Sequence, residues 1–99
     1  MKTKAVFFDI DGTLVSFRTH RIPKSTLEAV SRLRAEGVKV FIATGRPMPF
    51  INNLDGLEYD GIIESNGAHC QLTDGTVICH KPIPQTDIRN FVDYCRNNE

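Results

Sequence analysis

The sequence has no excess of charge of either sign and no long hydrophobic run. Twelve Lys and Arg residues balance twelve Asp and Glu residues, and the basic residues form no block. A chain of this kind lacks the electrostatic footprint of a nucleic-acid or membrane-surface binder, so neither partner is expected. The apolar run near the start, Ala5–Phe8, is too short for a signal-peptide core and far below the roughly 20 residues of a membrane span.

Cysteine is sparse, and no repeat, low-complexity segment or flexible linker interrupts the chain. Three cysteines without an export signal predict reduced thiols and a cytoplasmic location. With 99 residues, 40% hydrophobic and 24% charged, the composition is that of an ordinary globular chain of one domain at most.

The order of apolar runs and turn signals predicts an α/β fold. A buried strand is expected over residues 5–10, and a helix should begin at a capping box, Ser25–Glu28, and end before Gly37. Further elements are predicted in chain order: a buried strand Val38–Ala43, a helix from Pro47 to about Leu54, and a strand Gly61–Ser65. Strand and helix alternate here, which is typical of a parallel sheet with flanking helices.

A β-hairpin and a last helix should follow the third strand. Asp74-Gly75 between two short β-like runs predicts a two-residue turn. That turn would pair two sets of residues, Cys70 with Cys79 and His69 with His80. Opposed pairs project to opposite faces, so four ligands would not converge on zinc. Thr86 or Asp87 could cap the last helix.

Two carboxylates follow the first predicted strand. Asp9 closes the apolar run and Asp11 comes two residues later, so strand alternation would put both on one side and Ile10 on the other. In open α/β sheets, ligands bind beyond the carboxyl ends of the strands, where this pair is expected. Adjacent carboxylates repel unless a cation or a shared proton separates them, and Mg²⁺ suits such an oxygen-rich site. One carboxylate could then attack phosphorus while the other transfers protons.

A simple chain reversal at Asp11-Gly12 is the plainer interpretation of the same residues. It accounts for Gly12, but not for an acid at the end of an apolar strand. A calcium loop needs acids at positions 1, 3 and 5 and Gly at 6. Counted from Asp9, Gly12 is at position 4, which excludes that loop.

Three short motifs resemble those of the haloacid dehalogenase superfamily. Residues 9–13, Asp-Ile-Asp-Gly-Thr, resemble its first motif, and residues 43–46, Ala-Thr-Gly-Arg, its second. Residues 65–68, Ser-Asn-Gly-Ala, resemble the Cof-type branch, which consists largely of sugar-phosphate and related phosphatases. The resemblance implies a Rossmann-like three-layer core, with residues 1–82 as its N-terminal half and residues 83–99 as the start of an inserted cap domain.

The resemblance also implies roles for the residues at matching positions. Asp9 matches the nucleophile that forms an aspartyl-phosphate, and Asp11 matches the general acid and base. The Asp9 carboxylate and the Asp11 backbone carbonyl match two ligands of Mg²⁺. The Thr44 hydroxyl, helped by backbone N–H groups around Ile10 and Gly45, matches the group that holds a phosphoryl oxygen. Superfamily ATPases have Thr where Asp11 stands, so the acid favours a phosphatase over a pump. The Cof-type resemblance implies small phosphorylated metabolites as substrates.

Two further residues each have two interpretations. Arg46 either contacts the substrate or cap, or is a surface arginine at the start of a helix. Asn66 either lines the substrate pocket or forms an Asn-Gly turn near the left-handed region. The position of Asn66 after the third strand favours the pocket.

Two later family motifs are not found in the 99 residues. One is a lysine that neutralises the phosphoryl group, for which Lys81 is a remote substitute, and the other is an acidic Gly-Asp-x-x-x-Asp cluster. Their absence keeps an alternative open, a truncated or degenerate fragment that at most binds phosphate and Mg²⁺ weakly. The missing half of the family core would also flank the first strand, so Ala5–Phe8 is expected to form an unpaired edge prone to self-association.

Overall fold

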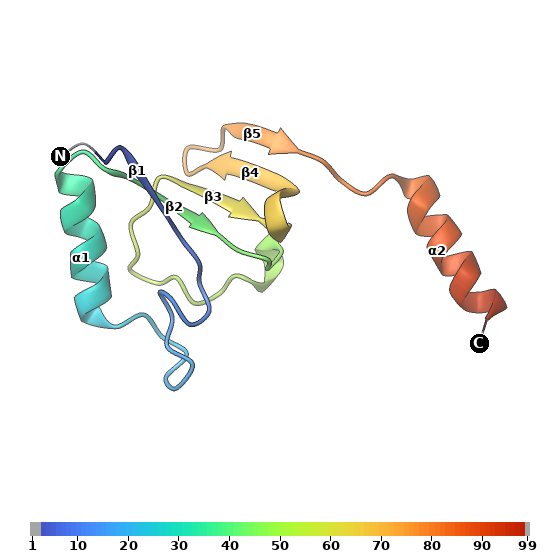
Figure 1. Cartoon of the computed structure of the whole chain (residues 1–99), viewed down its shortest axis with the longest axis horizontal. Helices are drawn as coiled ribbons and strands as arrows, with labels where there is room; N and C mark the ends of the chain where they lie inside the picture. The colour runs from blue at the N-terminus through green and yellow to red at the C-terminus, as the bar shows by residue number, and fades with distance from the viewer. Residues whose placement is uncertain (1–2, 99) are drawn as a thin grey trace.

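The computed structural model describes residues 3–98, which form one sheet, two α-helices and two 3₁₀ turns (Figure 1). In chain order the elements are β1 (Ala5–Phe8), α1 (Lys24–Ala35), β2 (Lys39–Ala43), η1 (Met48–Phe50), β3 (Gly61–Glu64), η2 (Ser65–Gly67), β4 (His69–Leu72), β5 (Val77–His80) and α2 (Gln85–Asn97). The predicted α/β order of three strands, a hairpin and a last helix is confirmed.

All five strands belong to one mixed sheet in the order β1-β2-β3-β4-β5. The first three strands run parallel, while β4 and β5 are antiparallel and extend the sheet beyond β3. Because α1 connects β1 to β2, the crossover is that of a βαβ unit. The carboxyl ends of β1, β2 and β3 therefore meet at one end of the sheet, and the predicted site residues follow them there.

The hydrophobic core lies between α1 and one face of the sheet. Val40 and Ile42 alternate along β2 with less buried neighbours and are completely buried. They pack with Ile62 of β3 and Val30 of α1. The core is completed by side chains from the segments that follow β1 and precede β3: Ile10, Leu14, Val15 and Leu57. The turn that carries the two acids is thus anchored in the core through Ile10.

β1 is an edge strand of the described sheet, as expected for Ala5–Phe8 from the family resemblance. The prediction of a fully buried strand over residues 5–10 is corrected. The strand ends at Phe8, and Phe7 is 57% exposed. The Phe7 ring stacks on that of Phe41 across the face opposite the core, with ring centroids 5.1 Å apart. A continuous apolar run resembles a central strand, but it carries no information on whether a neighbour lies on each side.

The start of α1 differs from the prediction. The helix begins at Lys24 after Pro23, which takes the N-cap position, and the Ser25–Glu28 capping box does not form. The carbonyl of Pro23 accepts the N–H groups of Thr26 and Leu27. Proline fixes its φ at a value that suits a helix start, so α1 begins one residue before Ser25.

The end of α1 is as predicted. Gly37 has a φ of 87°, which glycine adopts without strain. The Val38 N–H donates to the Leu33 carbonyl and the Gly37 N–H to the Arg34 carbonyl, the two bonds of a Schellman motif. The chain is thereby turned directly into β2.

The prediction of a helix from Pro47 to about Leu54 is wrong. Only a single 3₁₀ turn, Met48–Phe50, forms, and Ile51 is already extended. Pro49 disfavours helical backbone at the residue before it, which limits the helix that Pro47 could start. Residues 51–60 therefore cross to β3 without regular structure.

The strand pairs of the predicted hairpin are confirmed. Cys70 lies opposite Cys79 and His69 opposite His80. Both cysteines of the pair are free thiols. The two imidazoles meet through their Nδ1 atoms at 2.9 Å.

The hairpin loop has three residues, 73–75, where two were predicted. The Leu72 N–H donates to the Thr76 carbonyl at 2.8 Å, and Gly75 has a φ of 96°. The extra loop residue is absorbed by a register shift between Cys70 and Gln71. An Asp-Gly pair fits both loop lengths, because a left-handed glycine also closes a three-residue loop.

α2 lies apart from the sheet at the end of an extended segment (Figure 1). Its residues are exposed throughout, including the apolar Ile88, Phe91 and Val92. The radius of gyration is 17.0 Å, against about 13 Å for a compact chain of this length. Within residues 3–98, neither helix is long and apolar enough to cross a membrane.

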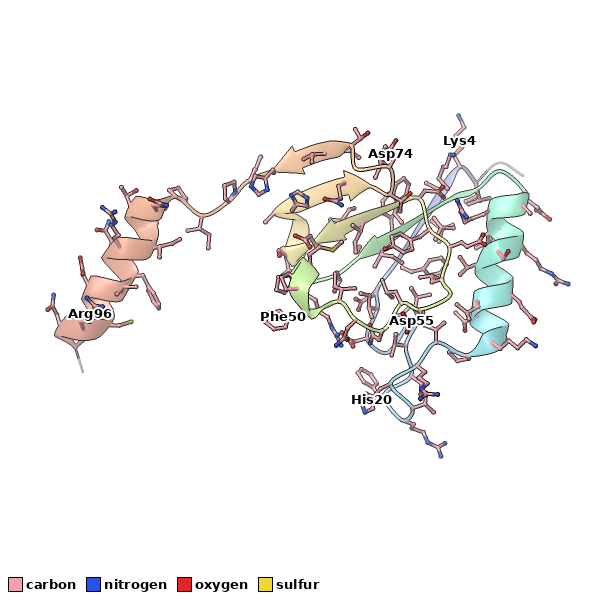
Figure 2. The ribbon with its side chains drawn as sticks, turned by 180° about the vertical axis from the view of Figure 1, so that it is seen from behind. Lys4, His20, Phe50, Asp55, Asp74 and Arg96 are labelled. Carbon is pink, nitrogen blue, oxygen red and sulfur yellow. The ribbon has the colours of Figure 1, made fainter. Side chains whose placement is uncertain are left out.

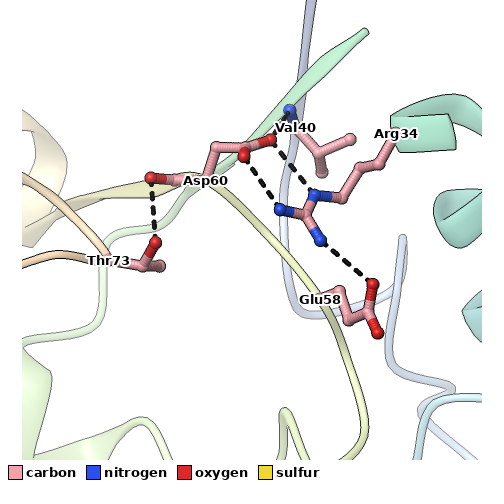
Figure 3. Close-up of polar contacts among 5 residues, drawn as sticks. All are labelled: Arg34, Val40, Glu58, Asp60 and Thr73. Carbon is pink, nitrogen blue, oxygen red and sulfur yellow. Dashed lines mark hydrogen bonds and ion pairs between the residues drawn. The ribbon is translucent and has the colours of Figure 1, made fainter. Parts of the chain in front are cut away.

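Asp60, just before β3, connects three parts of the fold at the amino ends of the parallel strands (Figure 3). Its carboxylate accepts the Val40 N–H at 2.8 Å and two N–H groups of Arg34 at 3.0 and 3.3 Å. Its backbone carbonyl accepts the Thr73 N–H, and Arg34 also donates to Glu58. We refer to these five residues as the Asp60 clamp. The hydrogen bonds from Arg34 and Val40 lower the pKa of the Asp60 carboxyl.

Candidate active site

The predicted site residues lie in three loops at the carboxyl ends of β1, β2 and β3. In Figure 2, Phe50 of η1 lies at this end of the sheet and Asp74 of the hairpin loop lies at the opposite end. Near the end of its strand, each loop is hydrogen-bonded within itself or to a neighbouring loop, as described below. The side chains that they carry are therefore held by the sheet.

The loop after β1 is a tight turn around Ile10. The Ile10 carbonyl accepts N–H groups from Leu14 and Val15, and the Ile10 side chain is completely buried. Gly12 has a φ of 79°, and a Cβ there would lie 2.5 Å from the Phe17 ring. A side chain at residue 12 would thus be strained by its backbone and would have to displace the exposed Phe17 ring.

Asp9 leaves β1 with one carboxylate oxygen engaged. Its Oδ1 accepts the Ile10 N–H at 2.8 Å, and no hydrogen bond within residues 3–98 reaches Oδ2. The Ile10 N–H, expected to contact a phosphoryl oxygen, is thus bonded to Asp9 here. The interaction fixes the Asp9 rotamer and leaves one oxygen accessible.

Thr44 is buried at the end of β2, with 6% of its surface exposed. Its hydroxyl oxygen accepts the Arg46 N–H at 3.0 Å, which leaves the hydroxyl proton free to be donated. Gly45 follows in a close approach, since a Cβ on it would lie 3.0 Å from the Asn66 side-chain oxygen. The second motif therefore presents a hydroxyl donor beside a glycine against which the Asn66 side chain packs.

The loop after β3 contains three consecutive residues with positive φ: Ser65 at 49°, Asn66 at 55° and Gly67 at 95°. Such backbone is unfavourable for the non-glycine residues and is kept only where the surroundings hold it. Here the Asn66 N–H donates to the Thr44 carbonyl and the Ser65 N–H to the Arg46 carbonyl, both at 3.1 Å. The third loop is thereby fastened to the second.

A cavity of about 420 Å³ opens between these loops. It is lined by residues from all three strands or the loops after them: Asp9, Ala43, Thr44, Gly45, Ile63, Asn66 and Gly67. Four of the predicted site residues, Asp9, Thr44, Gly45 and Asn66, thus come together. Asn66 is left-handed and also lines the cavity.

Ile10, Asp11 and Arg46 do not line this cavity. The Asp11 carboxylate is bound by the Arg46 guanidinium, with Nε to Oδ2 at 2.9 Å and a second, shorter contact from Nη2 to Oδ1. The hydrogen bond with Asp11 raises the pKa of Arg46. The observed side-chain partner of Arg46 is thus another of the predicted site residues.

Sequence reasoning missed several features of this site. Ala43, Ile63 and Gly67 line the cavity, and strand alternation could have found the first two, because they face away from the buried Ile42 and Ile62. No sequence signal pointed to the Phe50 carbonyl, which accepts the third arm of Arg46 at 3.0 Å. Lys81 is exposed and does not line the cavity; its N–H continues the hairpin by donating to Ala68.

The oxygen donors near the cavity fit Mg²⁺ in kind but are few. One oxygen of Asp9 and the Asp11 carbonyl accept no hydrogen bond from the described residues, and both are hard oxygen ligands. Within residues 3–98, no three His, Cys, Asp or Glu side chains gather closely enough to hold a metal ion. Mg²⁺ usually keeps several waters and takes only one or two carboxylates, so this small donor set is compatible with it.

A model of the haloacid dehalogenase-like hydrolases matches residues 6–99. The chain belongs to the haloacid dehalogenase-like hydrolase family. The resemblance of its motifs is thus confirmed at the level of the family.

Relatives and solved structures agree with the family assignment. YkrA of Bacillus subtilis (strain 168), which carries a provisional phosphatase name, is 37% identical over 94 residues, covering 93% of this chain and 35% of YkrA. The structure of the phosphatase BT1666 from Bacteroides thetaiotaomicron is 40% identical with a TM-score of 0.87, covering 96% of this chain and 35% of that one. The subclass IIB sugar phosphatase BT4131 is 51% identical with a TM-score of 0.83, covering 97% and 38%. The chain therefore spans about a third of the length of these relatives.

Proposed function

We propose that these residues form part of a Mg²⁺-dependent phosphatase of the Cof-type branch. Its substrates would be small phosphorylated metabolites such as sugar phosphates, hydrolysed through an aspartyl-phosphate. The cavity that joins Asp9 to the Thr44 hydroxyl carries this proposal. A nucleophile and a hydrogen-bond donor lie there on one surface, with a second carboxylate, Asp11, two residues further on. BT4131, the sugar phosphatase that is 51% identical, supports the substrate class.

In the first step, the accessible Asp9 oxygen attacks phosphorus and the bond to the leaving oxygen breaks. The Asp11 carboxyl gives its proton to that oxygen, which departs as an alcohol. The Thr44 hydroxyl donates to a phosphoryl oxygen, where negative charge must be stabilised. Gly45 has no side chain of its own, which leaves room for the Asn66 side chain beside it at the cavity.

In the second step, the Asp11 carboxylate takes a proton from water as the water oxygen attacks phosphorus. The bond between Asp9 and phosphorus breaks, which releases inorganic phosphate and restores the Asp9 carboxylate. Asp11 is again protonated and ready for the next substrate. The Asp9 carboxylate and the Asp11 carbonyl would hold Mg²⁺, whose chemistry is to neutralise charge between the nucleophile and the phosphate.

The test is the substitution Asp9→Asn in the protein produced from the full reading frame that contains these residues. Turnover of p-nitrophenyl phosphate with Mg²⁺ should fall by at least about 10³-fold, because the amide is not a nucleophile. EDTA should abolish wild-type turnover and added Mg²⁺ should restore it. Asp55→Asn is the control, since Asp55 is an exposed carboxylate in the loop before β3.

Turnover by Asp9→Asn at a near wild-type rate would contradict the proposal. A Mg²⁺-dependent burst of phosphoenzyme without further turnover would favour the alternative of a module that binds phosphate but does not complete the reaction. The absence of lysine from the residues that line the cavity favours that alternative.

Self-association and a cytoplasmic location complete the proposal. The free edge of β1, the exposed Phe7 and an apolar hollow lined by Phe8, Leu14 and Leu33 support pairing through β1. Sedimentation of the 99-residue chain should show dimers or larger species that Phe7→Lys reduces. A monodisperse monomer would contradict pairing through β1. The free thiols of Cys70 and Cys79 fit a reducing compartment, and their alkylation state in cells tests the location.

A further inference from the structure

Arg46 is fixed at both its backbone and its side chain. Its N–H donates to the Thr44 hydroxyl and its carbonyl accepts the Ser65 N–H, so the second and third loops both hold its backbone. One arm of its guanidinium donates to the Phe50 carbonyl at 3.0 Å. The remaining arm and Nε form the fork that binds Asp11.

The fork leaves Asp11 able to react. A carboxylate has about four lone-pair positions, of which two parallel bonds from an arginine use two. Both Asp11 oxygens therefore keep an acceptor position while the plane of the group is fixed by the guanidinium. Asp11 is 40% exposed, so water or a substrate oxygen can approach it.

We propose that Arg46 is the residue that positions Asp11 for proton transfer, and that it is not principally a phosphate ligand. This inference rests on the proposed phosphatase function. The Asp11 side chain has no other hydrogen-bond partner within residues 3–98, and Arg46 does not line the cavity that contains Asp9 and Thr44. Without Arg46, Asp11 would be free to rotate away from the leaving oxygen.

The experiment compares Arg46→Gln with Asp11→Asn in the full reading frame. Two substrates are used, p-nitrophenyl phosphate, whose leaving group departs without a proton, and glucose 6-phosphate, whose leaving group needs one. For glucose 6-phosphate, Arg46→Gln should lower kcat about 10²-fold and change KM by less than about 2-fold. Displacing a reacting group by about 1 Å can cost about 10²-fold in rate. The phosphorylation step with p-nitrophenyl phosphate, measured in a single turnover, should fall several-fold less.

A double-mutant cycle gives a second readout. If Arg46 acts through Asp11, adding Arg46→Gln to Asp11→Asn should cost almost nothing further. Arg46→Lys should recover only part of the loss, because an ammonium group does not form the planar fork. Arg32→Gln is the matched control, an exposed arginine of α1.

Three results would overturn the inference: a rise in KM with kcat unchanged, equal losses for both leaving groups, or full additivity with Asp11→Asn. A third readout needs no turnover. Calorimetric binding of inorganic phosphate should be unchanged in Arg46→Gln, and the ¹³C carboxyl resonance of Asp11 should shift. Weakened phosphate binding with an unmoved resonance would contradict the positioning role even in an inactive protein. Loss of wild-type turnover alone would count against the proposed function instead.

Discussion

Two arginine–carboxylate pairs lie at opposite ends of the parallel strands and differ in burial and in partners. At the amino ends, the Asp60 side chain is 17% exposed and accepts hydrogen bonds from Arg34 and from the backbone of Val40. At the carboxyl ends, the Asp11 side chain is 40% exposed and is bound by Arg46 alone. The first pair joins α1, β2 and the segment before β3, whereas the second joins two loops.

The difference shows that an ion pair does not by itself indicate what a carboxylate does. A backbone N–H in a strand cannot leave its acceptor without disturbing the sheet, so Asp60 is bound to the fold itself. Asp11 has no such partner and keeps acceptor positions that solvent can reach. The bond from a strand N–H, added to the bonds from Arg34, therefore distinguishes the structural carboxylate Asp60 from Asp11, which remains available for chemistry.

The largest expected effect on stability is that of Asp60→Asn. The change removes the negative charge of the carboxylate to which Arg34 and the Val40 N–H donate. It should lower the free energy of unfolding by about 2 kcal/mol. Urea denaturation of the variant and the wild type measures it. Asp11→Asn is the matched control, which should leave the urea midpoint unchanged because exposed ion pairs stabilise little. Equal midpoint losses for both variants would remove the distinction between the two pairs.

A smaller effect is expected from pH. The pKa of Asp60 is lowered in the folded state, mainly by Arg34. The clamp therefore contributes fully above the ordinary aspartate pKa of about 3.9, and that contribution is lost as pH falls through the lowered value. Urea denaturation at a series of acidic pH values should show a steeper loss for wild type than for Asp60→Asn. Parallel curves would mean that the clamp carboxylate does not act in this way.

The smallest effect is expected for Asp74→Ala. Asp74 accepts the Thr76 N–H at 2.8 Å without an arginine, and this backbone bond lowers the pKa of its carboxyl. Asp74 is exposed in the hairpin loop, so its loss should lower the melting temperature only slightly, and Asp74→Asn should preserve it. A loss as large as that of Asp60→Asn would show that the backbone bond alone, without burial, makes a carboxylate structural.

Much of the fold follows from local sequence signals. The apolar runs of β2 and β3, the glycine that ends α1 and the Asp-Gly of the hairpin each act within a few residues. The gathering of Asp9, Thr44 and Asn66 also follows, because the ends of parallel strands meet at one end of a sheet. Each of these inferences needs only the order of elements.

Two of the features that were not predicted depend on distant neighbours. The apolar run of β1 does not reveal that Phe7 faces solvent, because exposure depends on what lies beside the strand. The partner of Asp11 is 35 residues away in Arg46, and their contact depends on the path of two loops. The start of α1 is a local matter instead, because Pro23 takes the N-cap position that was expected for Ser25.

β1 and β2 are neighbours in the sheet but lie far apart in the sequence, which has a consequence during synthesis. β1 pairs with β2, which the ribosome completes only after α1, whereas β3, β4 and β5 follow one another closely. Pairing between distant segments is slow to form because a longer loop must close. A nascent chain therefore carries β1 unpaired until residues 39–43 have emerged, and Phe7 is open to other chains throughout that interval.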